Sequence, residues 1–268
     1  MIYHRSKLYF NRYIQHSQAG FRANRSTADI CFTHKAMVEI TQQYKTKFYS
    51  VHLDLTKAFD TINRKILVQI FKDILPEDEL RLNTWLLSNI ELRISNKNKT
   101  TNYFTTNMGT PQGDISSPVY FNLYLAKAIY EIENHFHGQL NKKYNNLLGF
   151  ADDYQIVHTD NQKLQYIYEI TRIILNRYNL KVNDKTKFIT YTREDNKDLE
   201  NWRETIVLGT TLDDTIKVQK IIDQSKLTFN KYLKKWNAKK ITFEQKIKYY
   251  KTLIISKLLY INLYIHSK

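Results

Sequence analysis

Two adjacent acidic residues, Asp152 and Asp153, lie between short apolar runs in the segment "GFADDYQIV" (149–157). Successive side chains of a β-strand point to opposite faces, so a continuous strand would bury one of these carboxylates. A turn between two strands, "NLLGF" and "YQIV", removes this difficulty because strict alternation fails there. The pattern therefore predicts a hairpin whose turn lets both carboxylates project from the same end.

Paired carboxylates repel each other unless a cation neutralises them. The chain has one cysteine, Cys31, which excludes a disulfide framework and a cysteine-based zinc cluster. A site made only of oxygen ligands favours a hard ion such as Mg²⁺. Asp54, at the end of the predicted strand "KFYSVHLDL" (47–55), is the best third ligand if the two strands share a sheet. Two Mg²⁺ ions on such carboxylates would serve phosphoryl transfer. Taken alone, the Asp-Asp pair also fits a simple polar turn.

The elements that must position these residues are helices and strands in mixed order. Apolar periodicity, β-formers and breakers predict helices at 27–43, 62–74, 77–90, 118–134, 161–178, 219–237 and 242–263, strands at 47–55, 186–192 and 205–209, and hairpins at 92–107 and 146–157. We expect Ser26 or Thr27 to cap the first of these helices, and Ser117 followed by Pro118 to open the central helix. The pattern indicates an antiparallel sheet with helices on one face, followed by a helical C-terminal piece.

The charge of the chain suggests its partners. There are 41 Lys and Arg residues against 26 Asp and Glu, a net charge of +15. Such an excess favours nucleic acid as a partner, although a solubilising surface would give the same balance. The apolar C-terminal stretch is interrupted by Lys257 and is too short to span a membrane. We therefore expect a soluble intracellular protein without a membrane partner, with the nucleus as one alternative compartment.

Six segments together resemble the motifs of reverse transcriptases, in the same order along the chain. They are "QAGFRANRSTADI" (18–30), "VHLDLTKAFDTI" (51–62), "GTPQGDISSPVYFNLYL" (109–125), "GFADDYQIV" (149–157), "LKVNDKTKFI" (180–189) and "VLGTTL" (207–212). The "KAFD" form looks most like non-LTR retrotransposon enzymes and makes an intron-type maturase a weaker match. The resemblance implies an α+β right-hand polymerase palm with partial fingers and a helical thumb. It places partial fingers at 1–48, the palm at 49–218 and the thumb, or its start, at 219–268.

The resemblance also implies roles for residues near Asp54. Asp54 and Asp152 would be the main metal ligands, Asp153 would complete the acidic cluster, and the Leu55 carbonyl would join the metal shell. Phe59 takes the position under the incoming sugar. A ring there would collide with a 2′-hydroxyl, so Phe59 favours deoxynucleotides; its alternative is an ordinary core position. Asp60 is expected to cap the following helix.

Other motif residues would bind nucleotide or nucleic acid. Gly109, Gln112 and Gly113 would form a loop in which missing side chains permit close backbone approach. The resemblance places the Gln112 amide against the incoming nucleotide and template. Lys185 and Lys187 are both candidates for the general acid that protonates pyrophosphate, because the Asn-to-Lys spacing is one residue short of the usual pattern. Candidates for contact with template or duplex phosphates are Arg22, Arg25, Lys187, Lys231, Lys234, Lys235, Lys239 and Lys240.

Two classes of function follow. The first is an RNA-directed DNA polymerase core that uses two Mg²⁺ ions, with Mn²⁺ as a substitute, an RNA template, a DNA or RNA primer and deoxynucleoside triphosphates. The second is a catalytically inactive nucleic-acid-binding or structural protein on the same fold. Intact carboxylates favour the first class, whereas the short segment before "QAGFR" favours the second and predicts a fragment, a truncated copy or a protein kept for another purpose. The template, the priming mode and the oligomeric state have no signature in the sequence.

Overall fold

The computed structural model divides the chain into two compact units. One unit combines Met1–Ile30 with Thr41–Arg193, and the other combines Cys31–Ile40 with Glu194–Lys268. The residues that the structure describes are 2–96, 99–111, 113–136, 147–191, 204–208, 210–213, 223, 226–227, 229–231 and 242–256.

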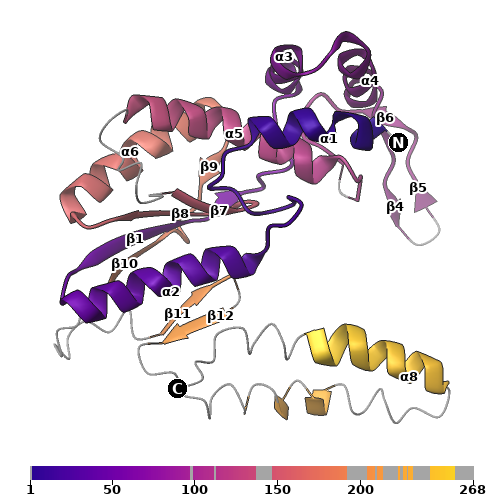
Figure 1. Cartoon of the computed structure of the whole chain (residues 1–268). Coiled ribbons are helices and arrows are strands. Elements are labelled where there is room, and N and C mark those ends of the chain that lie inside the picture. Colours follow the sequence, from indigo (N-terminus) through magenta and orange to yellow (C-terminus); the bar gives the residue numbers. More distant parts are fainter. Residues whose placement is uncertain are drawn as a thin grey trace. The chain divides into compact units, whose positions relative to one another are not determined.

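A four-stranded antiparallel sheet forms the centre of the first unit (Figure 1). Its strands, in spatial order, are β10 (Lys187–Tyr191), β1 (Phe48–Leu53), β8 (Asp153–His158) and β7 (Leu147–Phe150). Val51 of β1 lies opposite Ile156 of β8 on one side and Phe188 of β10 on the other. The antiparallel sheet and the hairpin around the Asp-Asp pair are therefore confirmed.

The hydrophobic core lies between this sheet and two helices, α5 (Ser117–His135) and α6 (Asn161–Arg177). Figure 1 shows both helices along the same side of the sheet. Val51, Leu53 and Ile156 belong to the same buried cluster as the apolar residues of α5. Residues 119–126 of α5, all apolar except Asn122, are buried, as the apolar early turns of this helix predict.

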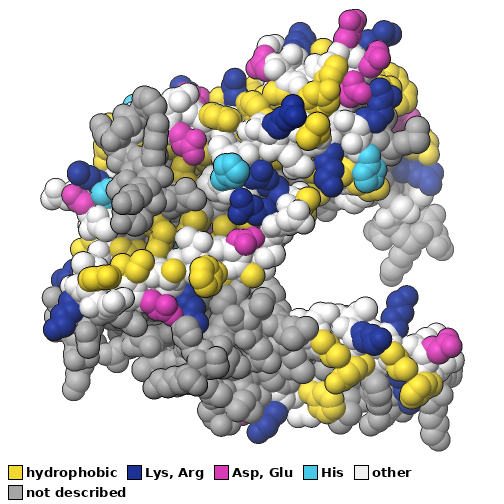
Figure 2. Space-filling model, in the orientation of Figure 1, with side chains coloured by type: hydrophobic (Ala, Val, Ile, Leu, Met, Phe, Trp, Pro, Cys, Tyr) yellow, Lys and Arg dark blue, Asp and Glu magenta, His cyan; other side chains and the backbone are white. Residues whose placement is uncertain are grey.

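A group of three helices extends this core: α1 (Ile2–Tyr13), α3 (Arg64–Ile74) and α4 (Glu77–Ser88). Helix α1 was not expected from the sequence, where half of the residues are polar or charged. Buried Phe10 anchors it by packing on Phe71 of α3, with ring centroids 6.0 Å apart. Figure 2 shows Lys, Arg, Asp and Glu side chains mixed over the surface of these helices.

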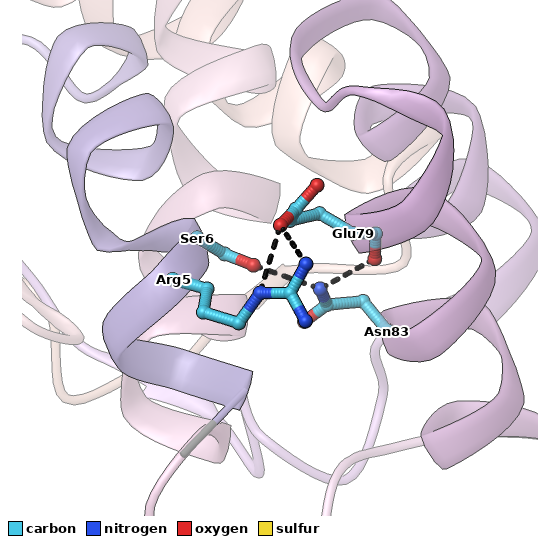
Figure 3. A network of polar contacts seen from close by, with 4 residues as sticks. All are labelled: Arg5, Ser6, Glu79 and Asn83. Atoms are coloured by element: carbon cyan, nitrogen blue, oxygen red, sulfur yellow. Dashed lines mark hydrogen bonds and ion pairs between the residues drawn. The ribbon is translucent and has the colours of Figure 1, made fainter.

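Polar contacts fix α1 against α4 (Figure 3). The Arg5 guanidinium donates to Glu79 Oε1 at 2.7 Å and 3.0 Å. Asn83 is fully buried, and its Nδ2 donates to Ser6 Oγ at 3.0 Å and to the Glu79 carbonyl. Asn83 Oδ1 accepts from the Tyr120 hydroxyl at 2.6 Å, so α5 joins the same network.

Two predicted helix starts are corrected. Asn63, not Asp60, caps α3, since its side chain accepts from the Lys65 N–H at 3.0 Å. Ser116, not Ser117, precedes α5, and Pro118 falls at the second helical position. In α2 (Thr27–Tyr44), the Ser26 N–H donates to the Asp29 carboxylate at 2.7 Å, which agrees with a start at Ser26 or Thr27.

Short strand pairs complete the first unit. The predicted strand at 47–55 is interrupted at Asp54: β1 ends at Leu53, and β2 (Leu55–Thr56) pairs with β9 (Lys181–Val182). The hairpin predicted at 92–107 is confirmed by the pairs β3 (Glu91–Leu92) with β6 (Phe104–Thr105) and β4 (Ser95–Asn96) with β5 (Lys99–Thr100).

The second unit contains residues 31–40 of α2, the hairpin of β11 (Glu204–Val207) and β12 (Thr210–Asp213), α8 (Phe243–Tyr249) and a π-helix, η1 (Tyr250–Ile255). A capping box between Thr242 and Gln245 starts α8. Most of the helix predicted at 219–237 lies outside the described residues. The proposed finger, palm and thumb boundaries stay predictions. Within the described part of the chain, no helix is long and apolar enough to cross a membrane.

Candidate active site

Asp54 and the Asp152–Asp153 turn meet where two neighbouring strands end. Strand β1 pairs with β8 so that Leu53 lies opposite Tyr154. Asp54 directly follows Leu53 and Asp153 directly precedes Tyr154, so the antiparallel register places these two aspartates opposite each other. The expectation that the two strands share a sheet, with Asp54 beside the Asp152–Asp153 turn, is confirmed.

The turn between β7 and β8 has an unusual backbone at Ala151. Phe150 pairs with Asp153, which leaves Ala151 and Asp152 as the two turn residues. Ala151 has φ 57°, in the left-handed region that residues with a Cβ rarely adopt. Ala151 is also 95% buried, since only 5% of its surface is exposed. A buried turn in this conformation needs support from the surrounding chain.

The electrostatics of the turn show that the carboxylates interact. Desolvation by the surrounding chain raises the pKa of the Asp153 carboxyl, although the residue as a whole retains an exposed surface. The negative charges of Asp152 and then Asp54 raise the same pKa further. A positive charge among these side chains would therefore be stabilised.

The three aspartates do not form a ready-made metal cage. Across the described residues, no three His, Cys, Asp or Glu side chains are arranged to hold a metal ion together. The donor set nevertheless fits Mg²⁺, because all three groups are carboxylates, the oxygen ligands that this hard ion prefers.

The turn that carries Lys185 is hydrogen-bonded to the backbone of Asp54. The Asn183 N–H donates to the Asp54 carbonyl at 2.7 Å, and the Asp54 N–H donates to Thr186 Oγ1 at 3.4 Å. The Lys185 N–H donates to Asn183 Oδ1 at 3.3 Å within the same turn. Lys187 is the first residue of β10 and lies opposite His52. Both lysines are exposed.

Phe59 lies in the segment between Asp54 and α3. Its half-buried ring stacks on the fully buried ring of Phe121 from α5, with centroids 4.5 Å apart and planes 28° apart. The Phe59 carbonyl accepts from the Thr110 N–H at 3.1 Å, and the Ile62 carbonyl accepts from the Gly109 N–H at 2.8 Å. These bonds tie the segment after Asp54 to the start of the "GTPQGD" loop.

Arg64, which the sequence did not single out, anchors the same loop from α3. Its Nε donates to the Gly109 carbonyl at 2.8 Å. Nη1 donates to the carbonyls of Leu87, at 3.2 Å, and Thr106, while Nη2 donates to Thr106 Oγ1 at 2.8 Å and to the Met108 carbonyl at 3.1 Å. All five guanidinium N–H groups are thereby used. Burial lowers the pKa of Arg64, which has only 9% of its surface exposed.

The two glycines of the loop differ. Gly109 has φ 74°, and a Cβ there would lie 2.8 Å from the Asp60 carbonyl oxygen, so close backbone approach is confirmed at this residue. Gly113 has φ 93°, but no heavy atom of the chain lies within 4 Å of a Cβ built there. Glycine at 113 is thus explained by backbone conformation alone. Gln112 lies outside the described residues.

The predicted phosphate-binding residues have different surroundings. Arg22 donates to the carbonyls of Gln15, Gln18 and Asn11 at 2.7, 3.2 and 3.2 Å, which gives it a structural task in the segment before α2. Arg25 is exposed and its Nη2 lies 3.4 Å from His16 Nδ1. Lys231 is exposed, whereas Lys234, Lys235, Lys239 and Lys240 lie outside the described residues.

Comparison with known proteins agrees with this geometry. A sequence model of the family "Reverse transcriptase (RNA-dependent DNA polymerase)" matches residues 4–250. The chain belongs to the reverse transcriptase family. Its fold class, an α+β polymerase palm, is confirmed by solved telomerase structures. Telomerase from Candida tropicalis in complex with a fragment of telomeric RNA has TM-score 0.62, 13% identity, and coverage of 97% of this chain and 46% of the other.

Telomerase from Candida albicans with the same kind of RNA fragment gives TM-score 0.62 at 11% identity, covering 99% of this chain and 49% of the other. A curated relative in sequence is the "Putative COX1/OXI3 intron 2 protein" of Saccharomyces cerevisiae, 30% identical over 135 residues. That alignment covers 50% of this chain and 15% of the relative, so this reverse transcriptase chain spans a small part of the yeast protein's length. The narrower likeness to non-LTR retrotransposon enzymes stays a prediction, and this relative is an intron protein.

Proposed function

We propose that this chain is the core of an RNA-directed DNA polymerase that extends a primer with deoxynucleotides. The observation that carries the proposal is the register of β1 and β8, which sets Asp54 opposite Asp153 beside the Asp152 turn. Membership of the reverse transcriptase family supports the same reaction.

Asp54, Asp152 and Asp153 are the proposed ligands of two Mg²⁺ ions, with the Leu55 carbonyl as a further oxygen donor and Mn²⁺ as a substitute metal. When bound, these ions supply charge neutralisation for the attacking 3′-oxygen and the leaving pyrophosphate. The raised pKa of Asp153 supports this assignment, because carboxylates that repel one another favour a cation among them.

The nucleotide pocket is assigned to Phe59, Gln112 and Gly113. The Phe59 ring is held by stacking on Phe121 and by backbone bonds to the "GTPQGD" loop, so it cannot move aside without breaking these contacts. A ring held in this way would exclude the 2′-hydroxyl of a ribonucleotide. Gly113 has open space around its α-carbon, which suits close approach of a nucleotide.

Lys185 is our choice over Lys187 as the general acid that protonates pyrophosphate. Its turn is hydrogen-bonded to both the N–H and the carbonyl of Asp54, whereas Lys187 is a strand residue opposite His52. Arg25 and the lysines at 187, 231, 234 and 235 are proposed to contact phosphates of template and primer. Arg22 would support them by shaping the segment that carries Arg25.

The proposed partners are an RNA template, a DNA or RNA primer and deoxynucleoside triphosphates. The net charge of +15 supports a polyanionic partner. Structurally similar telomerases have been solved in complex with a telomeric RNA fragment, which supports RNA as one partner.

Primer extension tests the proposal. The purified chain is given an RNA template with an annealed DNA primer, Mg²⁺ and either deoxynucleotides or ribonucleotides. Asp152→Ala with Asp153→Ala serves as the inactive variant. Asp78→Ala, which removes an exposed aspartate from α4, is the matched control.

We expect extension with deoxynucleotides by the wild type and the Asp78 variant and none by the double variant. Phe59→Ala is expected to admit ribonucleotides. If no protein extends the primer while wild type and double variant bind the duplex equally, the polymerase proposal is wrong. The chain would then be a nucleic-acid-binding protein on a reverse transcriptase fold.

A further inference from the structure

The segment before α2 adds a short stretch of backbone to the edge of the sheet. The Ala19 N–H donates to the Gly149 carbonyl at 2.7 Å, and the Gly149 N–H donates to the Ser17 carbonyl at 2.8 Å. Gln18 forms a parallel bridge with Gly149, at the edge strand β7. This pairing brings Gln18 beside the turn that follows β7.

The Gln18 side chain binds both polar backbone groups of Ala151. Its Oε1 accepts from the Ala151 N–H at 2.9 Å, and its Nε2 donates to the Ala151 carbonyl at 3.1 Å. Oε1 also accepts from the Gly20 N–H at 2.8 Å. Gln18 is 3% exposed, so these bonds are shielded from water. The Gln18 amide thus supplies the two hydrogen bonds that the buried N–H and carbonyl of Ala151 would otherwise lack.

The Gln18 side chain and its bonds to Ala151, which we call the Gln18 clamp, are closely packed by neighbouring residues. A Cβ on Gly20 would lie 2.3 Å from the Ala151 nitrogen, so the clamp segment approaches the turn as only glycine allows. Asn122 of α5 holds the Gly20 carbonyl, with its Nδ2 donating at 2.7 Å. The turn is therefore connected through Gln18 and Gly20 to the central helix.

The Gln18 clamp holds the peptide group next to the Asp152 side chain. The Ala151 carbonyl belongs to the peptide group that links Ala151 to Asp152. Holding this group in place therefore also fixes the α-carbon of Asp152, from which its carboxylate side chain extends. Ala151 carries a Cβ and yet has φ 57° in a buried turn, a backbone conformation that persists only when the surrounding chain holds it.

We propose that Gln18 is a positioning residue, which holds the Asp152–Asp153 turn in the geometry that binds a divalent cation. Gln18 acts through the Ala151 backbone and touches neither metal nor substrate. A glutamine suits this task because it offers an acceptor and a donor at once and adds no charge beside the carboxylates. The inference rests on the proposed function, since it assumes a cation site at the turn.

The test compares Gln18→Met with Gln15→Met. Methionine keeps the length of the side chain and removes all three Gln18 bonds. Gln15 lies in the same segment and donates one bond, to the Ala126 carbonyl at 2.8 Å, so its substitution is a matched control away from the turn. Gln18→Asn is a milder, neutral variant, which keeps the amide but is one methylene shorter, so that it cannot make all three bonds.

The first readout is Mn²⁺ affinity, measured by electron paramagnetic resonance of the free ion, with circular dichroism to check folding. Changes to residues behind metal ligands commonly weaken metal affinity by about tenfold or more. We therefore expect about a tenfold loss for Gln18→Met, a smaller loss for Gln18→Asn and no change for Gln15→Met. If Gln18→Met does not fold, Gln18→Asn decides.

The second readout is steady-state extension. A positioning role predicts that Gln18→Met lowers kcat while the KM for primer–template stays unchanged, because Gln18 does not contact the duplex. Wild-type Mn²⁺ affinity in a folded Gln18 variant would overturn the proposal. A wild type that binds Mn²⁺ at the aspartates without extending primers would overturn the polymerase function alone. A wild type whose Mn²⁺ binding equals that of Asp152→Ala would overturn both.

Discussion

Two loops of the first unit, the Ala151–Asp152 turn and the loop at 106–113, are held in place by different chemistry. Both contain a residue in the left-handed region, Ala151 with φ 57° and Gly109 with φ 74°. The Ala151 turn is held by the neutral amide of Gln18 through two hydrogen bonds. The other loop is held by the charged guanidinium of Arg64, whose bonds end on three carbonyls and one hydroxyl of the loop and on Leu87 of α4.

The difference follows from what each loop carries. An arginine beside Asp152 and Asp153 would neutralise these carboxylates and compete with a metal ion for them. A glutamine holds the backbone and leaves the negative charge available. The loop at 106–113 has many carbonyls to satisfy and its bonds to Arg64 involve no carboxylate, so a cation with five donors is the stronger anchor there.

Removing Arg64 should therefore have the largest effect on stability. Arg64→Met removes the donor from two buried and two part-buried carbonyls, which we expect to lower the free energy of unfolding by about 4 kcal/mol. Urea denaturation measures this. Arg172→Met, which removes an exposed arginine paired with Glu169 on α6, is the control and should change stability by less than about 0.5 kcal/mol. Equal losses for both variants would contradict the anchoring role of Arg64.

Substitutions at Gly109 and Gly113 distinguish the cost of a steric clash from the cost of a positive φ alone. Gly109→Ala places a Cβ 2.8 Å from the Asp60 carbonyl oxygen at a positive φ, and should cost about 3 kcal/mol. Gly113→Ala meets open space at a similar φ and should cost about 1 kcal/mol. Thermal unfolding of the pair tests this. The comparison fails if Gly113→Ala is as costly as Gly109→Ala.

The pH dependence of stability probes the chain next to the Ala151 turn, through the hydroxyl of Tyr154. Complete burial raises the pKa of the Tyr154 hydroxyl, which is hydrogen-bonded to Ser17 at 3.0 Å. Above about pH 10 the folded state therefore keeps a proton on Tyr154 that the unfolded state has lost. As pH rises through 10, this difference lowers the free energy of unfolding by up to about 1.4 kcal/mol per pH unit.

Tyr154→Phe removes this contribution together with one hydrogen bond. We expect the variant to be about 1 kcal/mol less stable than wild type at pH 8, with the difference shrinking as pH rises from 9 to 11. Denaturation at a series of pH values gives both curves. A difference that stays constant over this range would contradict the burial of the Tyr154 hydroxyl.

The smallest effect concerns the start of α3, next to the Gly109 loop. Asn63→Ala removes the helix cap and should cost about 1 kcal/mol. Asp60→Ala, at the position first expected to cap this helix, should change stability by less than about 0.5 kcal/mol. Chemical denaturation of the two variants distinguishes them, and a larger loss for Asp60→Ala would restore Asp60 as the cap.

The same two loops show what could be predicted from the sequence. The Asp-Asp hairpin, the break at Asp54 and the buried central helix were predicted because local signals define them. These signals are paired acids between apolar runs, β-formers, and helical turns that are apolar on nearly every side. The roles of Gln18 and Arg64 were not predicted, since each depends on contacts with residues 133 and about 45 positions away. Helix α1 was missed for a similar reason: its apolar contacts, such as Phe10 with Phe71, exist only after folding.

Anomalous diffraction from a crystal of the chain soaked in Mn²⁺ tests the central claim most directly, because it locates the cation without depending on activity. We predict an anomalous peak bounded by the carboxylates of Asp54 and Asp152, with Asp153 beside it. Mn²⁺ bound only elsewhere, with these three side chains well ordered and pointing apart, would contradict the assignment of the β1–β8 junction as a metal-dependent active site.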